Sequence, residues 1–557
     1  MIIFGDSEQQ RRIEFLKRRE EEELAQILSH KYGVQYVDLS LVAINTDALR
    51  LLPEAQAKAC EAITFGLIGK KLNLAVRAPE HPKIKELVEQ LTQRGYVVTV
   101  YMASQESLGR GYARYVDLSF ATESKAGVFE ISPEEIEALL TKVKSLTDIA
   151  SLIQESSDAK RAYRITRVIE VILAGGMGLG ASDVHFEPEE MKVQLRYRLD
   201  GLLMDVLTLD QETYRLVLSR MKLLSGMKLN ITGEAQDGRF SIKVRGDEVE
   251  LRTSVLPGNY GETVVLRILN PKAIAVPLEE LGLEPKLRAR IEHEIARPNG
   301  MILTTGPTGS GKTTTLYAFM RKVNNPGTKI ITIEDPIEYH LPIVQTQVEK
   351  NYTFAQGLRS ALRADPDVIM VGEIRDSEVA ETAINAALTG HLVFSTLHTN
   401  NAAGTFPRLM DLGVSEKIMS SAINVAMAQR LLRKLCDTCK KERDPTDTER
   451  EVLTRILSGI MDRTLVPTNQ TKIWDANKDG CPACHGRGYK GRIGIFEAVF
   501  MDSAIEEILR SKPTEREIAA AARPQAVPTM QEDGVIKIFR GVTSLDELSR
   551  VVDLEVR

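Results

Sequence analysis

The sequence lacks the features of secreted and membrane-spanning proteins. Its first twenty residues contain no apolar core of the kind that signal peptides carry. No run of about 18 apolar residues occurs, so no membrane-spanning helix is predicted. We therefore expect a soluble protein in the cytoplasm.

An excess of charge of one sign is also lacking, and aromatic residues are few. The 72 Lys and Arg residues nearly balance the 77 Asp and Glu residues, which gives a formal net charge of −5. Nucleic-acid-binding proteins normally carry a basic surface, so direct binding of nucleic acid is not expected. Aromatic residues make up 5% of the chain, with a single Trp474, which favours aliphatic cores. The 557 residues suffice for about three to four domains.

Cysteine is scarce, but four of the five cysteines have the spacing of metal ligands. Cys436 and Cys439 form one C-x-x-C pair, and Cys481 and Cys484 form another. Four thiolates suit tetrahedral Zn²⁺. Disulfide bonds are the alternative, but a chain without a signal peptide is expected to stay in a reducing compartment, which favours zinc. Cys60 lies in an apolar helical context and is expected to pack in a core.

One stretch carries a complete phosphate-binding motif. Residues 301–305 predict a short buried strand, residues 313–320 predict a helix, and the segment between them matches G-x-x-x-x-G-K-[ST]. Backbone N–H groups of such a loop surround phosphate oxygens, and the helix adds the positive end of its dipole. We expect Lys312 to reach the β- and γ-phosphates of ATP and the Thr313 hydroxyl to ligate Mg²⁺. The predicted ATP-binding residues are Gly306, Pro307, Thr308, Gly309, Ser310, Gly311, Lys312, Thr313 and Thr314.

Three further predicted strands carry polar residues at their ends. Glu334 and Glu373 each follow an apolar strand, and His391 and His398 flank a third. Ligands of doubly wound sheets bind at the carboxyl ends of the strands, so we expect these four side chains beside the phosphates. Phosphoryl transfer needs one group that orients water, and Glu373 is the candidate. The three strands are predicted at residues 329–333, 368–371 and 392–396.

The pattern departs from an ordinary phosphate-loop ATPase at one position. Gly372 stands where an Asp that holds Mg²⁺ is usual, directly before the candidate catalytic Glu373. The metal ion is therefore expected to rely on Thr313 and water, with Glu334 or Asp335 farther out.

Local patterns predict the elements that precede the nucleotide segment. A charged amphipathic helix is expected at residues 11–28, followed by a small α/β domain and then by an antiparallel or mixed sheet packed by helices. Gln236-Asp237-Gly238-Arg239 is interpreted as a turn of that sheet. The other predicted elements are helices at 53–62, 82–94 and 165–173 and strands at 72–76, 97–101, 193–197, 248–253 and 263–268.

These segments resemble the secretion ATPase family, which drives type II secretion and type IV pilus assembly. Family members carry a Walker A loop, an Asp box, an atypical Walker B segment and a His box in this order, and a glycine at the position of Gly372 is a family trait. The resemblance extends over roughly residues 45–557. The matching segments are residues 181–188, 235–240, 306–313, 332–338, 362–376 and 389–400.

The resemblance implies an α/β architecture. A P-loop RecA-like nucleotide domain is preceded by a PAS-like α+β domain and an N-terminal α/β module, and it contains a zinc-binding subdomain. The expected domains are an N-terminal interaction domain at 1–118, a helical linker at 119–160, the PAS-like domain at 161–272 and the ATPase domain at 273–557, with the zinc subdomain at about 433–492.

The resemblance also implies a homohexameric ring of two-fold symmetry that uses ATP, Mg²⁺ and Zn²⁺. Its expected partners are an inner-membrane platform protein and accessory assembly proteins, which hold it at the inner face of the cytoplasmic membrane. Pilus-retraction and nucleic-acid-translocating ring ATPases of the same superfamily are the alternatives. Retraction members look shorter, so the N-terminal domain and the zinc module favour assembly.

Arginine residues are candidates for stabilising the transferred phosphoryl group in a neighbouring subunit. The predicted domain before the nucleotide domain supplies Arg196, Arg198, Arg239, Arg252 and Arg267, several of them beside turns or at strand positions. The resemblance favours Arg239 and Arg252 for this role.

Overall fold

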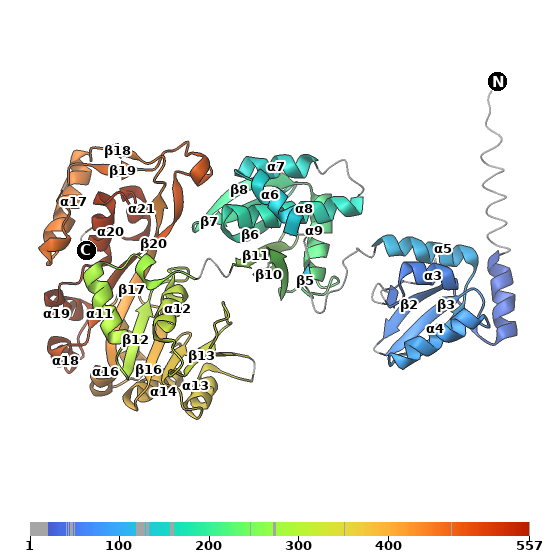
Figure 1. Cartoon of the computed structure of the whole chain (residues 1–557), viewed down its shortest axis with the longest axis horizontal. Coiled ribbons are helices and arrows are strands. Elements are labelled where there is room, and N and C mark those ends of the chain that lie inside the picture. Colours follow the sequence, from blue (N-terminus) through green and yellow to red (C-terminus); the bar gives the residue numbers. More distant parts are fainter. Residues whose placement is uncertain are drawn as a thin grey trace, which may run out of the picture. The chain divides into compact units, whose positions relative to one another are not determined.

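The computed structural model describes most of the chain, and its residues fall into two units. One unit comprises residues 1–124 and 158–166, and the other comprises residues 125–157 and 167–557 (Figure 1). Among the described residues, no helix combines the length and apolar character needed to span a bilayer. The described residues are 21–39, 42, 44, 48–49, 51–68, 70–117, 128–129, 133–155, 161–244, 247–270, 275–349, 351–468 and 470–555.

The first unit contains a four-stranded sheet with the order β1-β4-β3-β2. β4 is parallel to both β1 and β3, and β2 is antiparallel to β3. Leu72, Leu74 and Leu87 belong to its hydrophobic core, and Cys60 packs at the margin of that core. The predicted alternation of helices and strands is confirmed here. The elements are β1 (Gln35–Tyr36), α3 (Glu54–Cys60), β2 (Ala62–Ile68), β3 (Lys71–Val76), α4 (Pro82–Gln93), β4 (Val97–Met102), α5 (Gln105–Ala113) and η1 (Arg114–Asp117).

A helix at residues 21–32 precedes this sheet. It includes the second part of the charged helix predicted at residues 11–28, and residues 11–20 of that prediction lie outside the described residues. The Glu22 carboxylate accepts hydrogen bonds from the Tyr36 hydroxyl at 2.5 Å and from the Ser104 hydroxyl at 2.6 Å. These bonds hold the helix against the first unit.

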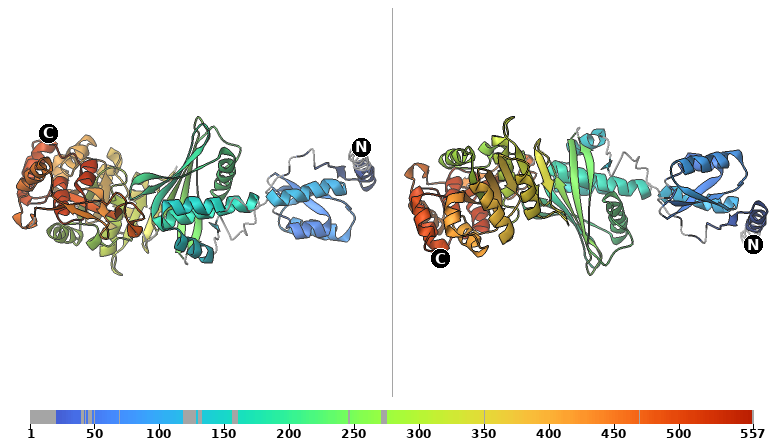
Figure 2. Two further views of the ribbon diagram at one scale, coloured as in Figure 1. Left: turned by 90° about the horizontal axis from the view of Figure 1, so that it is seen from above. Right: turned by 90° about the horizontal axis from the view of Figure 1, so that it is seen from below.

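The second unit contains a seven-stranded sheet with the order β5-β9-β10-β11-β6-β7-β8. Helix α8 packs on one face (Figure 2), where the Tyr197 hydroxyl donates to the Ile172 carbonyl at 2.6 Å. All neighbouring strands are antiparallel except β5 and β9. Its elements are β5 (Val128–Phe129), α6 (Pro133–Lys142), α7 (Leu146–Glu155), α8 (Arg161–Leu179, from residue 167 on), β6 (Ala181–Pro188), β7 (Val193–Leu199), β8 (Leu202–Leu209), α9 (Gln211–Leu224), β9 (Gln236–Val244), β10 (Asp247–Leu256) and β11 (Thr263–Leu269).

The predicted turn at residues 236–239 is wrong, because these residues form the first part of β9. Gln236 pairs with Val255 of β10 in this strand. The glycine that suggested a turn serves another purpose: a Cβ atom at Gly238 would lie 2.2 Å from the Ser225 carbonyl oxygen. Gly238 therefore lets the chain after α9 pass directly over the strand.

Helices α6 and α7 occupy the segment expected as a helical linker. Ile149 of α7 is fully buried, and its Cδ1 atom would lie 2.8 Å from a Cβ atom at Gly175 of α8. β5 of the same segment pairs with β9. Both helices and this strand are therefore packed with the second unit.

The remaining sheet has seven strands in the order β14-β13-β15-β16-β12-β17-β20. Six strands are parallel, and β20 runs antiparallel to β17 at one edge. Two hydrophobic clusters cover its faces, one with α11 and α12 and the other with α13 and α14. The strands are β12 (Gly300–Thr305), β13 (Ile330–Glu334), β14 (Val344–Gln347), β15 (Val368–Val371), β16 (Leu392–Leu397), β17 (Ile423–Leu435) and β20 (Tyr489–Phe500).

Helices and a small sheet complete this part of the chain. β18 (Lys441–Arg443) and β19 (Ile473–Asp475) form an antiparallel pair between β17 and β20. The helices are η3 (Leu278–Glu280), α11 (Pro285–Ile295), α12 (Lys312–Val323), α13 (Phe354–Leu362), α14 (Ser377–Leu388), α15 (Thr405–Asp411), α16 (Glu416–Ala422), α17 (Asp447–Gly459), η4 (Arg463–Leu465), η5 (Pro482–Cys484), α18 (Ser503–Leu509), α19 (Glu515–Ala522), η6 (Arg523–Gln525), α20 (Met530–Phe539) and α21 (Leu545–Val551).

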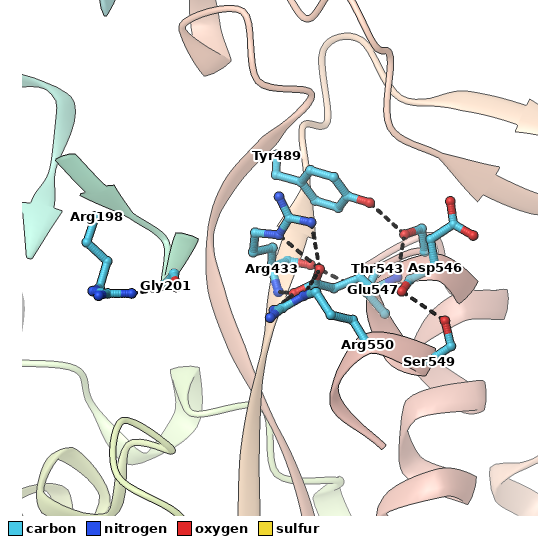
Figure 3. A network of polar contacts seen from close by, with 10 residues as sticks. Arg198, Gly201, Arg433, Tyr489, Thr543, Asp546, Glu547, Ser549 and Arg550 are labelled. Atoms are coloured by element: carbon cyan, nitrogen blue, oxygen red, sulfur yellow. Dashed lines mark hydrogen bonds and ion pairs between the residues drawn. The ribbon is translucent and has the colours of Figure 1, made fainter. Parts of the chain in front are cut away.

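A buried carboxylate fastens α21 to the end of β17 (Figure 3). Glu547 is 1% exposed, and it accepts hydrogen bonds from the Arg433 backbone N–H at 3.0 Å and from the Arg433 and Arg550 guanidinium groups at 2.7 and 2.6 Å. The Arg433 guanidinium lies 4.0 Å from the ring centre of Tyr489. This network ties the last helix of the chain to the hairpin formed by β17 and β20.

Candidate nucleotide and metal sites

The phosphate loop connects β12 to α12, as its sequence predicts. Gly306 and Gly311 have positive φ angles of 147° and 91°. A Cβ atom at Gly306 would lie 2.7 Å from both the Gln429 carbonyl oxygen and the Ser310 hydroxyl. Glycine at position 306 therefore satisfies both the backbone conformation and the close packing against β17.

Lys312 is the first residue of α12, and its ammonium group folds back over the loop. The Nζ atom donates to the carbonyl oxygens of Gly306 at 2.7 Å and Pro307 at 3.2 Å. Burial lowers the pKa of Lys312, whereas the nearby carboxylates of Glu373 and Glu338 raise it. A cation and two carboxylates thus share this end of the sheet.

Glu373 follows β15 and lies at the carboxyl edge of the sheet. One of its oxygens forms an ion pair with Arg375, and His398 Nε2 lies 3.3 Å from the other. His398 follows β16, and β16 pairs in parallel with both β12 and β15. The structure therefore brings Glu373 and His398 together at the edge where the phosphate loop begins.

His391 does not join them. It directly precedes β16, and the strand runs in the same direction as β12 from Gly300↔Leu392 to Thr305↔Leu397. The His391 Nδ1 atom lies 2.9 Å from the Ala386 carbonyl oxygen. The expectation that His391 lies beside the phosphates of its own chain is wrong, because a residue before a parallel strand lies at the amino edge of the sheet.

Gly372 occupies a position with little space. A Cβ atom there would lie 3.3 Å from the Ile333 carbonyl oxygen and 3.4 Å from the Phe354 ring. The Thr396 hydroxyl donates to the Gly372 carbonyl at 2.8 Å. A side chain at this position would be tightly packed against β13 and α13, so glycine suits the close packing around β15.

Glu334 is buried at the end of β13 and is engaged by neighbouring side chains. Its carboxylate accepts hydrogen bonds from the Tyr317 hydroxyl of α12, from the Thr332 hydroxyl at 2.6 Å and from the Gln345 amide at 2.9 Å. These bonds join α12, β13 and β14. Asp335, the next residue, is exposed, and its carboxylate lies 3.7 Å from Arg375.

Glu338 is a functional candidate that is not among the predicted site residues. Its carboxylate lies near the Thr313 hydroxyl, directly beside the phosphate loop. Burial raises the pKa of Glu338, although Arg252, Arg267 and Thr313 lower it. The only indication of this candidate in the sequence is that Glu338 is the third carboxylate of the segment that begins at Glu334.

The arginine candidates form a row across the second sheet. Arg252 pairs directly with Arg239 on one side and Arg267 on the other, so the three side chains share one face. The row continues to the buried Asp183, whose oxygens lie 3.1 Å from Arg267 and 3.2 Å from Arg198. Like charges directly opposite one another are unfavourable without a counterion.

Arg252 reaches the nucleotide-binding part of its own chain. Its guanidinium donates to the Ile337 carbonyl oxygen, next to Glu338. Arg239 is exposed at the end of the row. The phosphate-loop end of the sheet is thus flanked by arginine side chains of the same chain.

The four cysteines of the two C-x-x-C pairs form one cluster. Cys436 follows β17 and Cys484 precedes β20, and the antiparallel pairing of these strands brings the two pairs together. All four sulfur atoms lie within 4.8 Å of one another, and no cysteine forms a disulfide. The backbone N–H groups of Cys481 and Gly488 each donate to the Cys484 sulfur at 3.2 Å.

Comparisons with known proteins find similar sequences and folds. A family model described as "Type II/IV secretion system protein" matches residues 158–550, and a model described as "MshEN domain" matches residues 32–122. The "Type II secretion system protein E" of Pseudomonas aeruginosa is 41% identical over 420 residues, which cover 75% of this chain and 80% of that protein.

Similarity extends over nearly the whole chain in another relative. The "Type IV pilus assembly ATPase PilB" of Myxococcus xanthus is 32% identical over 538 residues, which cover 95% of this chain and 91% of that protein. Among solved structures, the ATPase DotB of Yersinia pseudotuberculosis has a TM-score of 0.50 at 20% identity, over 72% of this chain and 95% of that one. The last similarity concerns the fold alone.

Proposed function

Because the chain belongs to the type II/IV secretion system protein family, we propose that it is an ATPase that powers the assembly of pilin or pseudopilin subunits. The observation that carries this proposal is the convergence of Lys312, Glu338 and Glu373 at the edge of the sheet where the phosphate loop begins. The names of the type II secretion and type IV pilus relatives support the biological role.

The residues present suit ATP and Mg²⁺. The backbone N–H groups of Gly306 to Thr314 would surround the phosphates, and Lys312 would neutralise part of their charge. Thr313 and Glu338 would hold Mg²⁺, because a hydroxyl and a carboxylate supply the oxygen ligands that this ion prefers. When bound, Mg²⁺ supplies further neutralisation of phosphate charge.

Glu373 would orient the attacking water and accept its proton. His398, within hydrogen-bond reach of one Glu373 oxygen, would position the carboxylate. Glu334 would act from a distance by anchoring α12, which begins with Lys312.

The cysteine cluster would hold Zn²⁺ as a structural ion. Four sulfur donors leave no open coordination position, which is typical of structural rather than catalytic zinc. N–H groups directed at the Cys484 sulfur would stabilise its negative charge.

The proposed domain organisation follows the resemblance. Residues 273–557 would form a RecA-like ATPase domain, residues 161–272 a PAS-like domain and residues 1–118 an interaction domain, joined by the segment at 119–160. The chains would form a homohexamer in the cytoplasm, held at the inner membrane by a platform protein and accessory assembly proteins. The arginine row that includes Arg239 and Arg252 would supply positive charge to the transferred phosphoryl group.

Steady-state ATP hydrolysis tests this function. The purified wild-type protein should hydrolyse ATP in the presence of Mg²⁺, and Lys312→Ala should lose nucleotide binding. Arg252→Ala should bind ATP but hydrolyse it poorly. Absence of ATP hydrolysis by the assembled wild-type protein would contradict the proposal, and turnover that depends on added DNA would favour a nucleic-acid-translocating ATPase instead.

Mixed rings test how the arginine acts. If Arg252 serves its own chain, as its contact with Ile337 indicates, mixing Arg252→Ala with Lys312→Ala subunits should restore no turnover. Recovery of activity would show that the arginine serves a neighbouring subunit. ATP hydrolysis by an isolated monomer at the full rate of the assembled protein would refute the proposal that hydrolysis needs a homohexameric ring.

A further inference from the structure

Gln429 of β17 lies beneath the phosphate loop. β17 pairs with β12 up to Thr305↔Ala428, so Gln429 is the first residue beyond this pairing and lies level with the start of the loop. Its side chain is 1% exposed. Its Nε2 atom would lie 3.0 Å from a Cβ atom at Gly311, and its carbonyl oxygen 2.7 Å from one at Gly306. The residue therefore contacts both ends of the loop.

A single side-chain hydrogen bond joins Gln429 to the middle of the loop. Its Nε2 atom donates to the Ser310 carbonyl oxygen at 2.8 Å. Because a carbonyl oxygen can only accept, the amide nitrogen rather than the amide oxygen must face it. The orientation of this amide group is therefore determined by its partner.

The bond has a consequence for the next backbone N–H group. In a planar trans peptide, the C=O of residue 310 and the N–H of residue 311 point in opposite directions. Gln429 holds the Ser310 carbonyl towards β17, so the Gly311 N–H is directed away from β17. Glu373 and His398 follow β15 and β16, which lie on the other side of β12 from β17. The Gly311 N–H is therefore directed towards the side of the loop that carries the candidate catalytic residues.

A buried glutamine at this position has a cost. The Gln429 Oε1 atom has no hydrogen-bond partner in the described part of the chain, and neither does the Ser310 hydroxyl. A buried polar atom without a partner is unfavourable, and an apolar side chain of the same size would avoid that cost. The hydrogen bond from Nε2 to Ser310 explains why a glutamine occupies this position despite that cost.

We propose that Gln429 is a positioning residue that aims the Gly311 N–H at the phosphates of a bound nucleotide. This inference rests on the proposed ATPase function and assigns to β17 a part in phosphate binding. The same orientation is required in the ground state and in the transition state, so the interaction contributes to uniform binding. Losing it should raise KM and leave kcat nearly unchanged.

Gln429→Met tests the proposal, because methionine keeps the volume of the side chain but cannot donate to Ser310. The full-length protein should bind ADP about tenfold more weakly, since a hydrogen bond to a charged group contributes about that factor or more. KM for ATP should rise by the same factor, with kcat within about twofold of wild type. Equilibrium titration with ADP and steady-state kinetics provide the measurements.

A matched control comes from Gln525 in the same domain. Its side chain makes two hydrogen bonds to the Phe500 backbone and none to the loop. Gln525→Met should bind ADP as the wild type does. A Gln429→Met protein that binds ADP within twofold of wild type, or an equal loss in Gln525→Met, would overturn the inference while leaving the ATPase proposal intact. A wild-type protein that binds no ADP would overturn both.

A second variant adds a pH profile that a purely structural role would not produce. The ionised carboxylate of Gln429→Glu cannot donate to Ser310, but its protonated form can. Its ADP affinity, expressed relative to wild type at each pH, should therefore be lowest at pH 8 and recover as the pH falls. A ratio that stays constant with pH would contradict the donor role.

Discussion

His398 Nε2 lies 3.3 Å from one oxygen of Glu373, while Arg375 forms an ion pair with the other oxygen. Both oxygens of the candidate water-orienting carboxylate are therefore engaged by cationic or hydrogen-bonding groups at the same sheet edge. Water can be activated by Glu373 only if one of these contacts is exchanged or shared. This arrangement leads to the first prediction.

Glu373→Gln should retain ATP binding but lower the hydrolysis rate by about 10²-fold or more, because the amide cannot accept a proton from water. Single-turnover hydrolysis and a nucleotide-binding titration separate the two effects. The exposed Glu378, which pairs with Arg359 on the surface, offers a control: Glu378→Gln should hydrolyse ATP normally. Near-normal turnover in Glu373→Gln would remove Glu373 from this role.

Replacing Glu338 should have opposite effects on stability and activity. Burial raises the pKa of Glu338, so the folded state holds its proton to a higher pH than the unfolded state. Stability then declines as the pH rises from the unfolded pKa through the folded one, and the charged form remains costly at neutral pH. At pH values above this range, Glu338→Gln should therefore raise the Tm of the nucleotide-free protein. At pH values below the range, the Tm should be unchanged.

The activity of the same variant should fall. Glu338→Gln removes a charged oxygen beside Thr313, so the Mg²⁺ concentration needed for half-maximal turnover should increase several-fold. Melting curves between pH 4 and 8 test the prediction for stability, and a Mg²⁺ titration of turnover tests the prediction for activity. A lower Tm at neutral pH, or an unchanged Mg²⁺ requirement, would contradict the placement of Glu338.

The purified protein should contain one Zn²⁺ per chain. Cys481→Ser should lower both the zinc content and the Tm, because metal binding contributes to folding stability. Cys60, which lies outside the cluster, is the matched control: Cys60→Ser should keep its zinc. Elemental analysis that finds no zinc, together with free titration of all four thiols, would rule out the site.

Glu547 should stabilise the chain in a pH-dependent way. Burial by itself raises its pKa, but hydrogen bonds from Arg550 and Arg433 outweigh this effect and lower the pKa. Its stabilising contribution is therefore present above the unfolded pKa and is lost as the pH falls through the folded pKa. Glu547→Ala should cost about 3–5 kcal/mol at pH 7, because it leaves Arg433 and Arg550 without their buried partner.

Denaturant unfolding at pH 7 and below pH 4 measures this contribution. The difference between Glu547→Ala and wild type should shrink in acid. Glu506→Gln, which removes an exposed ion pair with Arg510, should change stability by less than about 1 kcal/mol at either pH. Equal losses for the two variants would show that the buried network adds nothing.

The sequence was sufficient to predict the edge of the sheet at which the site forms. A strand–loop–helix pattern identifies the phosphate loop, and parallel strands that end in Glu334 and Glu373 must meet beside it. The error at His391 has a simple cause: it precedes its strand, and the direction of a parallel strand places it at the opposite edge. The position of His391 before its strand was therefore enough to predict that it lies at the opposite edge.

Contacts between distant segments could not be predicted in the same way. Gly238 appears in a segment with the composition of a turn, but its requirement for glycine comes from Ser225, 13 positions earlier, as a packing partner. Glu338 reaches Thr313 through the folding of the chain after β13, and Gln429 reaches Ser310 through the pairing of β17 with β12. Local sequence patterns do not indicate such contacts between residues that are far apart in the sequence.

The pairing of Leu435 with Tyr489 closes the hairpin of β17 and β20 before the cysteine cluster begins. Residues 436–488 are therefore an insertion at the end of a hairpin, and two strand ends about 5 Å apart could be joined by a short turn. However, Leu453 and Leu457 of α17, inside the insertion, belong to the same core cluster as Val535 of α20. The hairpin could be closed without the insertion, but removing the insertion would expose apolar surface of α20. A relative could therefore lack the insertion only if another apolar surface covered α20.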